Sequence, residues 1–192
     1  DLGPDQTVSW DLACTGGGAV TITVTPAGTD ANTGLAAAAT ADEVVVQQET
    51  KAALVAEIMA PADGATLSTE QVFVVSAEVT NPGEAVAENV SATISVSGPA
   101  QLAAGETAVK ALTDIGAAQT VTWTLECTGT GAVDITVTPS GTDENSGMAI
   151  DGTPDTVMVD QEAKAHLVAD ILAPADGETY SSEDVFTVSV SV

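Results

Sequence analysis

Hydrophobic and polar residues alternate along most of this 192-residue chain. Residues 119–127, with the sequence QTVTWTLEC, show the pattern most clearly. Val121, Trp123, Leu125 and Cys127 fall on one side of an extended backbone, and the polar residues between them fall on the other side. A period of two indicates a β-strand with one buried and one solvated face.

The same alternation predicts further strands at residues 54–60, 72–79, 89–96, 108–115, 131–138 and 156–160. Turn sequences such as NPGEA and PADG separate them, and seven strands in about 110 residues are typical of a β-sandwich. Because only a short TGT turn separates strands 119–127 and 131–138, we expect these two strands to form a hairpin. Residues 34–42 have helical propensity, but the related residues 147–155 contain Gly and Pro, so we interpret both as loops.

The chain repeats itself. Residues 1–79 recur without a gap at residues 114–192, with 49 of 79 positions identical at an offset of 113. This period is too long for a solenoid and fits one small domain per repeat. We therefore predict the C-terminal part of one repeat at residues 1–51, a complete repeat at 52–164, and the N-terminal strands of the next repeat at 165–192.

Both terminal segments lack strand partners, so we expect that neither folds alone. On this view residues 1–50 hold the last three strands of a repeat. Two explanations are open: the chain is a window of a longer tandem protein, or segments of neighbouring chains complete each other in a fibre. The junctions ETKAA and EAKAH are five residues long, too short for a loose tether, and predict touching repeats in a stiff rod.

The charge is strongly negative. The chain has 28 Asp and Glu residues against three Lys and no Arg, for a net charge of −25. Such a surface repels nucleic acid phosphates and anionic lipid headgroups, so we expect no nucleic acid partner. We find no run of 18 apolar residues and expect no membrane insertion of this part. The 44% of hydrophobic residues, in periodic patterns, argue against disorder.

Two cysteines and two tryptophans occupy equivalent repeat positions. Strand parity places Trp10 with Cys14, and Trp123 with Cys127, on inward faces. Equivalent positions of successive domains are too far apart for a disulfide. We interpret all four residues as core residues, with a cross-chain disulfide as the alternative for the cysteines.

The loops at residues 28–34 and 141–147 share a D-x-N-x-G pattern that resembles the start of a calcium loop. An EF-hand is excluded because its fifth position is Gly and its twelfth is Pro154. A looser Ca²⁺ site remains a hypothesis; its ligands would be Asp30, Asn32 and Asp42 in one repeat, and Asp143, Asn145 and Asp155 in the next. The alternative is a solvated turn in which Asp and Asn cap backbone N–H groups.

A second candidate calcium site lies at the junctions, where Glu49, Asp63 and Glu70 recur as Glu162, Asp176 and Glu183. Asn89 begins an N-glycosylation sequon on an outward face. Lys51 and Lys164 recur beside acidic residues; we favour exposed ion pairs over Lys–Asn isopeptide bonds. With His166 as the single histidine and no catalytic constellation, we expect no enzyme and no cofactor other than Ca²⁺.

Residues 72–96 (VFVVSAEVTNPGEAVAENVSATISV) and 119–147 (QTVTWTLECTGTGAVDITVTPSGTDENSG) carry a family resemblance. The chain resembles the tandem immunoglobulin-like modules of bacterial and archaeal surface proteins, closest to the CARDB type, the cell-adhesion-related domain found in bacteria. The resemblance implies an all-β fold of tandem seven-stranded immunoglobulin-like β-sandwiches, located outside the cell or on its surface. No family active-site residues exist to carry over.

These observations favour a structural extracellular protein, a rod or filament of tandem repeats whose partners are copies of itself. The alternative is an adhesin stalk, or a glycan- or protein-binding module whose ligand tip lies outside this chain. Because the loops of the two repeats are closely similar, scaffolding is favoured over a ligand site in one repeat.

Overall fold

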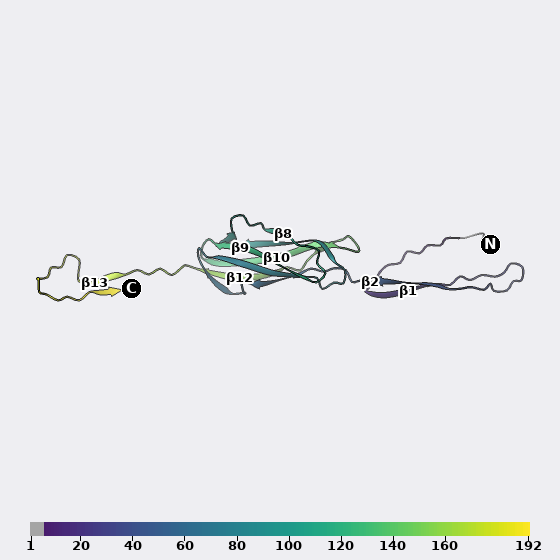
Figure 1. Ribbon diagram of the computed structural model, residues 1–192, viewed down its shortest axis with the longest axis horizontal. Coiled ribbons are helices and arrows are strands. Elements are labelled where there is room, and N and C mark those ends of the chain that lie inside the picture. The colour runs from purple at the N-terminus through teal and green to yellow at the C-terminus, as the bar shows by residue number, and fades with distance from the viewer. Residues whose placement is uncertain (1–5) are drawn as a thin grey trace.

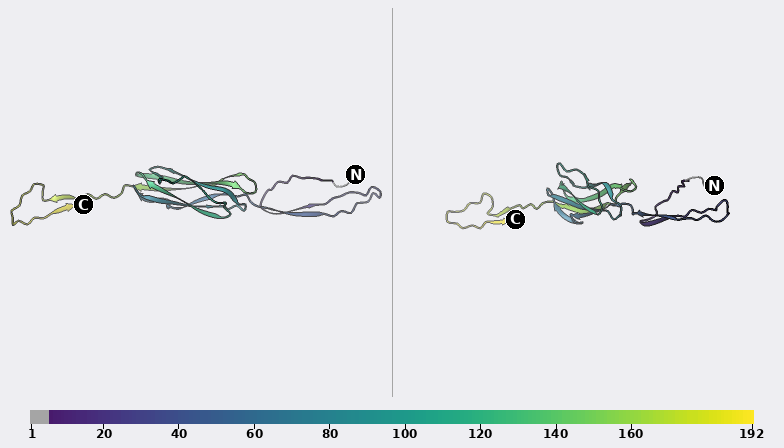
Figure 2. Two further views of the ribbon diagram at one scale, coloured as in Figure 1. Left: turned by 45° about the horizontal axis from the view of Figure 1, so that its top comes forward. Right: turned by 45° about the vertical axis from the view of Figure 1, so that its right-hand side comes forward.

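The computed structural model describes residues 6–192, so the first five residues of the predicted segment 1–51 lie outside the described part. The described residues contain strands and no helix, and hence no helix long and apolar enough to cross a membrane. Three parts follow one another along one axis in all three ribbon views (Figures 1 and 2). We call them the N-terminal segment (residues 6–51), the central unit (residues 52–164) and the C-terminal segment (residues 165–192).

The central unit contains ten strands rather than seven. Strands are present at all seven predicted places, although the one predicted at residues 108–115 covers only residues 109–111. Three further strands of three or four residues were missed, because such short runs carry no readable alternation. The strands are β3 (Val55–Ala60), β4 (Ala65–Ser68), β5 (Val72–Thr80), β6 (Ala87–Ser97), β7 (Ala100–Leu102), β8 (Val109–Ala111), β9 (Ala118–Cys127), β10 (Gly131–Asp143), β11 (Ala149–Asp151) and β12 (Asp155–Glu162).

Two sheets form the central unit. One has the order β3-β5-β9-β7, and the other has the order β4-β12-β10-β6-β8 with β11 paired to β10. Strand β4 runs parallel to β12, and the remaining strand pairs are antiparallel. This division of strands between two facing sheets is that of an immunoglobulin-like sandwich.

The core lies between the sheets and consists of the inward residues that the alternation predicts. Aliphatic residues dominate it, and Trp123 is the largest fully buried side chain. From the strands β5, β9 and β10 it receives Phe73, Val75, Ala77, Val79, Val121, Trp123, Leu125, Cys127, Val133, Ile135 and Val137.

The predicted hairpin of residues 119–127 and 131–138 is wrong. Strand β9 pairs with β5 and β7 in one sheet, whereas β10 pairs with β12 and β6 in the other. The TGT turn therefore carries the chain across the sandwich. Alternation could not reveal this, because both strands turn their apolar residues towards the same core from opposite sides.

Each terminal segment contains one antiparallel pair. Strands β1 (Gly18–Val24) and β2 (Asp42–Gln48) pair in the N-terminal segment, and β13 (Asp170–Ala173) and β14 (Ser189–Ser191) pair in the C-terminal segment. The third strand predicted for the N-terminal segment is not formed: residues 6–15 are not in a strand. Its counterpart β9 pairs with β5 and β7, and the N-terminal segment holds no counterpart of either.

Candidate functional site

The junction where the chain enters the central unit carries a network of polar contacts. We call residues 49–53 the linker; it comprises the last three residues of the N-terminal segment and the first two residues of the central unit. We call the loops 81–85, 114–117 and 143–148 the proximal end of the unit. The loops 61–64, 69–71, 98–99 and 128–130 form the opposite, distal end. Three polar residues are buried among residues 6–192: Asn81 and Asp143 lie at the proximal end, and Gln161 lies towards the distal end.

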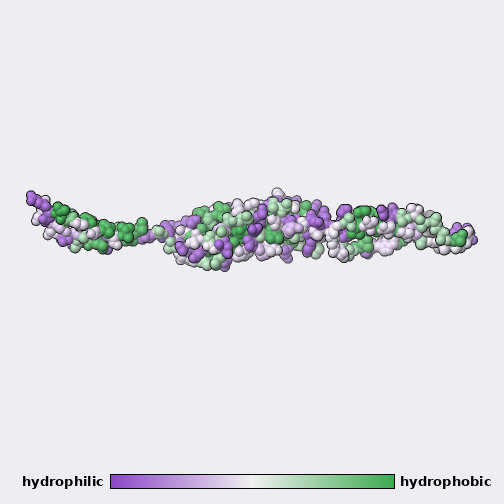
Figure 3. Space-filling model, turned by 90° about the horizontal axis from the view of Figure 1, so that it is seen from below, coloured by the Kyte–Doolittle hydropathy of each residue, from purple (hydrophilic) through white to green (hydrophobic). Residues whose placement is uncertain are grey.

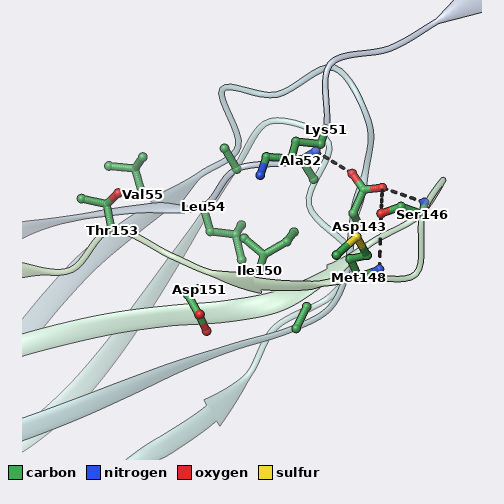
Figure 4. Close-up of a pocket in the computed structure, with 12 residues that line it drawn as sticks. Lys51, Ala52, Leu54, Val55, Asp143, Ser146, Met148, Ile150, Asp151 and Thr153 are labelled. Atoms are coloured by element: carbon green, nitrogen blue, oxygen red, sulfur yellow. Dashed lines mark hydrogen bonds between the residues drawn. The ribbon is translucent and has the colours of Figure 1, made fainter. Parts of the chain in front are cut away.

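Asp143 ends strand β10 and holds the linker directly. Its Oδ2 accepts a hydrogen bond from the backbone N–H of Ala52 at 2.7 Å. Its Oδ1 accepts two bonds from Ser146, from the backbone N–H and the hydroxyl, both at 2.8 Å. The Ala52 bond, followed by the Ser146 bonds, lowers the pKa of Asp143 below its ordinary value, because each donor stabilises the charged carboxylate. Figure 4 shows the carboxylate directed at both partners.

Asn81 follows strand β5 and holds the next linker residue. Its Oδ1 accepts hydrogen bonds from the backbone N–H groups of Ala53 and Gly83, both at 3.0 Å. Its Nδ2 donates to the carbonyl oxygens of Ala85 at 2.8 Å and Ile115 at 2.9 Å. The amide thus makes four hydrogen bonds, which offsets the cost of burying it.

The first half of the linker is bonded to the loop after β5. The carbonyl oxygen of Thr50 accepts hydrogen bonds from the backbone N–H groups of Glu84 at 3.2 Å and Ala85 at 3.0 Å. The N–H of Thr50 donates to Glu84 Oε2 at 2.8 Å, and Asn145 Nδ2 donates to Glu49 Oε2 at 3.0 Å. Four of the five linker residues are therefore tied to the unit that they enter.

Gly83 makes this approach sterically feasible. A Cβ atom at Gly83 would lie 2.3 Å from the carbonyl oxygen of Lys51 and 2.8 Å from the Cα of Ala52. Both contacts are with backbone that cannot swing aside. The glycine in the NPGEA turn is therefore needed so that the linker can pass over the loop.

A shallow pocket of about 370 Å³ lies beside the linker, with Leu54, Met148 and Ile150 among its apolar lining residues (Figure 4). Its polar groups Asp143 and Ser146 are already hydrogen bonded to one another and to the linker. This arrangement suits a structural contact rather than chemistry on a bound molecule.

The chain leaves the central unit at the distal end. The backbone N–H of Lys164 donates to Thr69 Oγ1 at 3.4 Å, and the N–H of Thr69 donates to the carbonyl oxygen of Glu162 at 2.9 Å. Lys164 also forms the expected exposed ion pair, with Glu70.

The carboxylates among the predicted calcium ligands accept hydrogen bonds from backbone N–H groups. Asp30 accepts hydrogen bonds within its own loop, from the N–H groups of Asn32 and Thr33, and these contacts, with that of the Thr33 hydroxyl, lower its pKa. Asp155 Oδ2 accepts a bond from the N–H of Ile58 at 2.7 Å, and Asp42 Oδ1 accepts one from the N–H of Glu43 at 3.1 Å.

These contacts are those of the alternative interpretation, in which Asp caps backbone N–H groups. Within residues 6–192, no three His, Cys, Asp or Glu residues are grouped to hold a metal ion. The sets Asp30, Asn32, Asp42 and Asp143, Asn145, Asp155 stay a prediction that the geometry of the described residues does not support.

The second calcium candidate is likewise divided between the two ends. Glu49 contacts Asn145 at the proximal end, whereas Glu70 pairs with Lys164 at the distal end. Asp63 Oδ1 accepts a hydrogen bond from the N–H of Met158 at 2.9 Å. The related residues Glu162, Asp176 and Glu183 belong to no group of three His, Cys, Asp or Glu residues within residues 6–192.

Asn89 is exposed, as the sequon interpretation requires, and it lies at a bulge in β6 with a φ of 51°. Its backbone N–H donates to Asp114 Oδ1 at 3.1 Å. The glycosylation itself stays a prediction.

The four predicted core residues divide into two pairs. Trp123 is 1% exposed and Cys127 is buried, as expected, and burial raises the pKa of the Cys127 thiol. Trp10 is 64% exposed and Cys14 is also exposed, so for these two the core prediction is wrong in this chain. Strands β5 and β7, which pair with the strand that carries Trp123, have no counterpart in the N-terminal segment. Both cysteines are free.

Sequence reasoning recognised the turn NPGEA but missed that Asn81, Gly83 and Glu84 in it receive the linker. The order Asn-x-Gly-Glu directly after a strand was the available signal. It also missed Gln161, whose amide nitrogen, oriented towards the carbonyl oxygens of Pro99 and Gly129, lies 2.7 Å from each.

Comparison with known proteins bears on the fold alone. No protein-family model matches the chain, and no curated protein matches it significantly. Among solved structures, the CARDB domain of a Pyrococcus furiosus protein is similar, with 13% identity and a TM-score of 0.41, over 59% of this chain and 97% of that chain.

Two other solved structures are similar at comparable levels. A cohesin module of a Clostridium perfringens family 33 glycoside hydrolase has 8% identity and a TM-score of 0.41, over 60% of this chain and 99% of that one. Domains 4 and 5 of the S-layer protein SbsC have 13% identity and a TM-score of 0.33, over 64% and 62%. The chain is thus similar in fold to a CARDB domain and to other sandwich modules.

Proposed function

We propose that this protein is a structural part of a cell-surface rod in which sandwich units follow one another at short, fixed junctions. The observation that carries the proposal is the linker. Four of its five residues are hydrogen bonded to the proximal end of the unit that it enters. The location outside the cell is the expectation that follows from the resemblance to tandem surface modules.

A linker held in this way restricts the orientation of the preceding part of the chain relative to the central unit. A free peptide of five residues would let two domains tilt widely, because each residue keeps two soft dihedral angles. Here Asp143 and Asn81 fix two successive N–H groups, and Thr50 is held through both its N–H and its carbonyl group. The direction in which the preceding part leaves the unit is therefore restricted.

The charge distribution fits a spacer. A net charge of −25 without any Arg gives a surface that repels other acidic surfaces, and this limits unspecific lateral contacts between rods. Salt shortens the range of that repulsion, so lateral association should increase with ionic strength.

The proposal is tested by small-angle X-ray scattering of the 192-residue chain. We expect the wild type to scatter as one extended particle. The double variant Glu84→Ala/Asn145→Ala removes the side-chain bonds to Thr50 and Glu49 outside the core, and we expect a broader distribution of maximum dimensions. Glu144→Ala is the matched control, since it removes a carboxylate of the same loop that makes no side-chain bond to the linker. A wild type as flexible as the double variant would contradict a rigid spacer.

Electron microscopy of native material tests the assembly. Straight rods of regular width support the structural role. Flexible stalks that end in a distinct globule would instead favour the adhesin alternative.

A further inference from the structure

One edge of the central sandwich is covered over only part of its length. In strand β9 the odd-numbered residues bond to the β5 side, where the N–H of Cys127 donates to the carbonyl oxygen of Gln71 at 2.9 Å. Because these groups alternate along an antiparallel strand, the even-numbered residues turn their N–H and C=O groups to the opposite side. There β7 pairs with residues 125–127 only, and the N–H of Ala103 donates to the carbonyl oxygen of Thr124 at 2.9 Å.

We call residues 118–123 of β9 the open edge. Among residues 6–192 no strand pairs with them on the side of β7, and no hydrogen bond reaches the outward-turned backbone groups of Ala118, Thr120 and Thr122. All three residues are exposed. An edge of this kind is a template on which a further strand can pair.

The other side of the sandwich shows how this protein closes an edge. At β3 the N–H of Ile58 donates to Asp155 Oδ2 at 2.7 Å, and at β12 the N–H of Met158 donates to Asp63 Oδ1 at 2.9 Å. Carboxylates thus occupy the N–H groups that an added strand would need there. The open edge of β9 has no such caps among the described residues.

The open edge is also uncharged, although the chain has 28 acidic residues. Residues 115–125 include no charged side chain, whereas hydrophilic residues are scattered over the face of the central unit seen in Figure 3. In the related repeat, Asp5 and Asp11 take the positions of Ala118 and Thr124. The charges that protect an edge strand from pairing are therefore present in one repeat and absent from the central unit.

The facing sheet continues past the open edge. Residues 108–112 run along β6, where the N–H of Leu112 donates to the carbonyl oxygen of Val90 at 2.8 Å. They lie on the same side of the sandwich as the open edge, since Gln119 Nε2 of β9 donates to the carbonyl oxygen of Thr113 at 3.3 Å. One sheet therefore has a strand at this side, and the other has an unfilled place in line with β7.

That unfilled place is one strand wide. Lys110 lies opposite the fully buried Ala92, so Ala108 and Leu112 also fall on the inner side of their strand. Both pack against the core but are only partly buried, and a strand added to β9 would cover them. A second copy that paired through its own β9 would bring its residues 108–112 into the same space, because antiparallel pairing keeps both facing sheets on one side. A single extended peptide fits instead.

The outer face beside the open edge calls for a basic partner. Glu57 of β3 lies directly opposite Glu78 of β5, and Glu78 lies opposite Thr120 of β9. Like charges in opposite positions are destabilising, and none of the residues in β3, β5, β9 and β7 is Lys or Arg. The next place in this row is the open edge, from which the flexible side chain of a Lys extends towards Glu78.

We propose that the open edge binds an extended, basic peptide segment of a partner protein, which adds a strand to the sheet β3-β5-β9-β7. The main chain of the segment pairs with the free groups of Thr120 and Thr122. Its apolar side chains, at alternate positions, cover Ala108 and Leu112, and the lysines between them face outwards beside Glu78. The partner is thus a strand in which apolar and basic residues alternate.

This inference goes beyond the proposed spacer role and does not depend on it. An edge that binds no peptide refutes the docking site but leaves the rigid linker untouched. A flexible linker refutes the spacer but leaves the open edge as it is.

The first test follows backbone amide hydrogen exchange of the wild-type chain by NMR. The probe is the capped peptide KVKVKVK, and the control is KPKPKPK, which has the same charge but cannot pair as a regular strand. At saturation, exchange at Thr120 and Thr122 should slow by about tenfold or more with the probe, as for amides that gain a hydrogen bond, and stay unchanged with the control. No slowing, or equal slowing by both peptides, overturns the proposal.

The same measurement without peptide tests a second copy as the occupant. We expect exchange at Thr120 and Thr122 to be independent of protein concentration. Protection that grows with protein concentration would identify a second copy of the chain at the open edge and would overturn the peptide proposal.

The second test removes one main-chain donor. Thr120→Pro should weaken binding of KVKVKVK by about tenfold, measured by calorimetry, because the N–H that faces the added strand is lost. Proline is tolerated at such a position, since this N–H makes no bond within the sheet. Thr120→Ala is the control, which keeps the N–H and should bind like the wild type. Unchanged affinity of Thr120→Pro, or an equal loss in Thr120→Ala, overturns the pairing.

The third test separates the local charge from the net charge. Glu78→Gln should weaken binding of KVKVKVK by about twofold, as expected for one exposed ion pair. Glu88→Gln is the matched control, because it removes the same charge from β6 in the other sheet, and it should leave the affinity unchanged. Equal losses in the two variants would mean that the overall negative charge attracts the peptide, and would overturn the proposed placement.

Discussion

The N-terminal segment and the central unit contain closely similar sequences in two different surroundings. Strands β1 and β2 pair with Gly18 opposite Gln48 and Val20 opposite Val46. Strands β10 and β12 pair in the same register, with Gly131 opposite Gln161 and Val133 opposite Val159. Yet Val46 is 41% exposed, whereas Val159 is fully buried.

The difference separates local from non-local stabilisation. The register of β1 on β2 depends on these two strands and on the loop that joins them, so it is kept when the remaining strands are absent. Burial depends on the facing sheet, which the N-terminal segment does not have. The same sequence therefore retains its pairing and loses its core.

Asp30 and Asp143, which are equivalent residues of the repeat, show the same difference between local and non-local contacts. Both accept hydrogen bonds from their own turn, from Thr33 and Ser146 respectively. Only Asp143 also accepts the N–H of Ala52, which lies 91 positions away in the chain. The turn is encoded locally, whereas the contact with the linker requires the sandwich.

The largest expected difference concerns the two tryptophans. Trp123→Ala should lower the free energy of unfolding of the central unit by about 3–5 kcal/mol, because it opens a cavity in the core. Trp10→Ala should change it by less than about 0.5 kcal/mol, as for an exposed residue. Urea unfolding followed by circular dichroism, in dilute protein, measures both. Equal losses would mean that Trp10 is also buried.

The next effect is expected at the linker. Gly83→Ala places a methyl group against the backbone of Lys51 and should cost about 1–3 kcal/mol of unfolding free energy. Gly116→Ala is the matched control, because a Cβ there meets no atom within 4 Å. Thermal unfolding of both variants gives the comparison. If Gly83→Ala is as stable as Gly116→Ala, the linker does not pass over the loop as described.

A smaller and pH-dependent effect is expected at Asp143. Because the folded state lowers the pKa of this carboxyl, its contribution to stability is present above the ordinary aspartate pKa and is lost as the pH falls through the lowered value. Asp143→Asn replaces one accepting oxygen with an NH₂ group, which then faces the donors of Ala52 or Ser146. We expect this change to lower the melting temperature at neutral pH. The difference from the wild type should shrink in acid.

The comparison with Asp30 sharpens that result. Asp30→Asn should leave the melting temperature of the central unit unchanged at every pH, although the pKa of Asp30 is lowered as well. A pH-independent gap between wild type and Asp143→Asn would show that the charge of Asp143 has no part in holding the linker.

The smallest effect is expected for the ion pair of Lys164 and Glu70, whose side chains are mostly exposed. Lys164→Met should lower the unfolding free energy by no more than about 0.5 kcal/mol, and less at high salt. Lys51→Met is the related change at the first junction, where Lys51 forms no ion pair with residues 6–192. Salt titration of the melting temperature distinguishes the two variants.

Much of the fold could be predicted from the sequence, since inward residues such as Trp123 and Ile135 repeat every second position. The short strands β4, β7 and β11 could not be, because three or four residues give no period. The candidate site was harder to predict from the sequence. Asn81 has no counterpart elsewhere in the 192 residues, so the repeat could not mark it, and the acidic loops were interpreted through metal chemistry that their geometry does not support.

The sequence by itself determined seven of the ten strands of the central unit and their buried faces, because these depend on alternation between neighbouring residues. Only the tertiary structure decided that β9 and β10 lie in different sheets. It alone also placed Asp143 and Asn81 on the linker, and left Trp10 exposed while Trp123 is buried. The physical reason is the same in each case: burial and long-range hydrogen bonds need partners that are distant in sequence, and alternation along one strand does not say which partners are present.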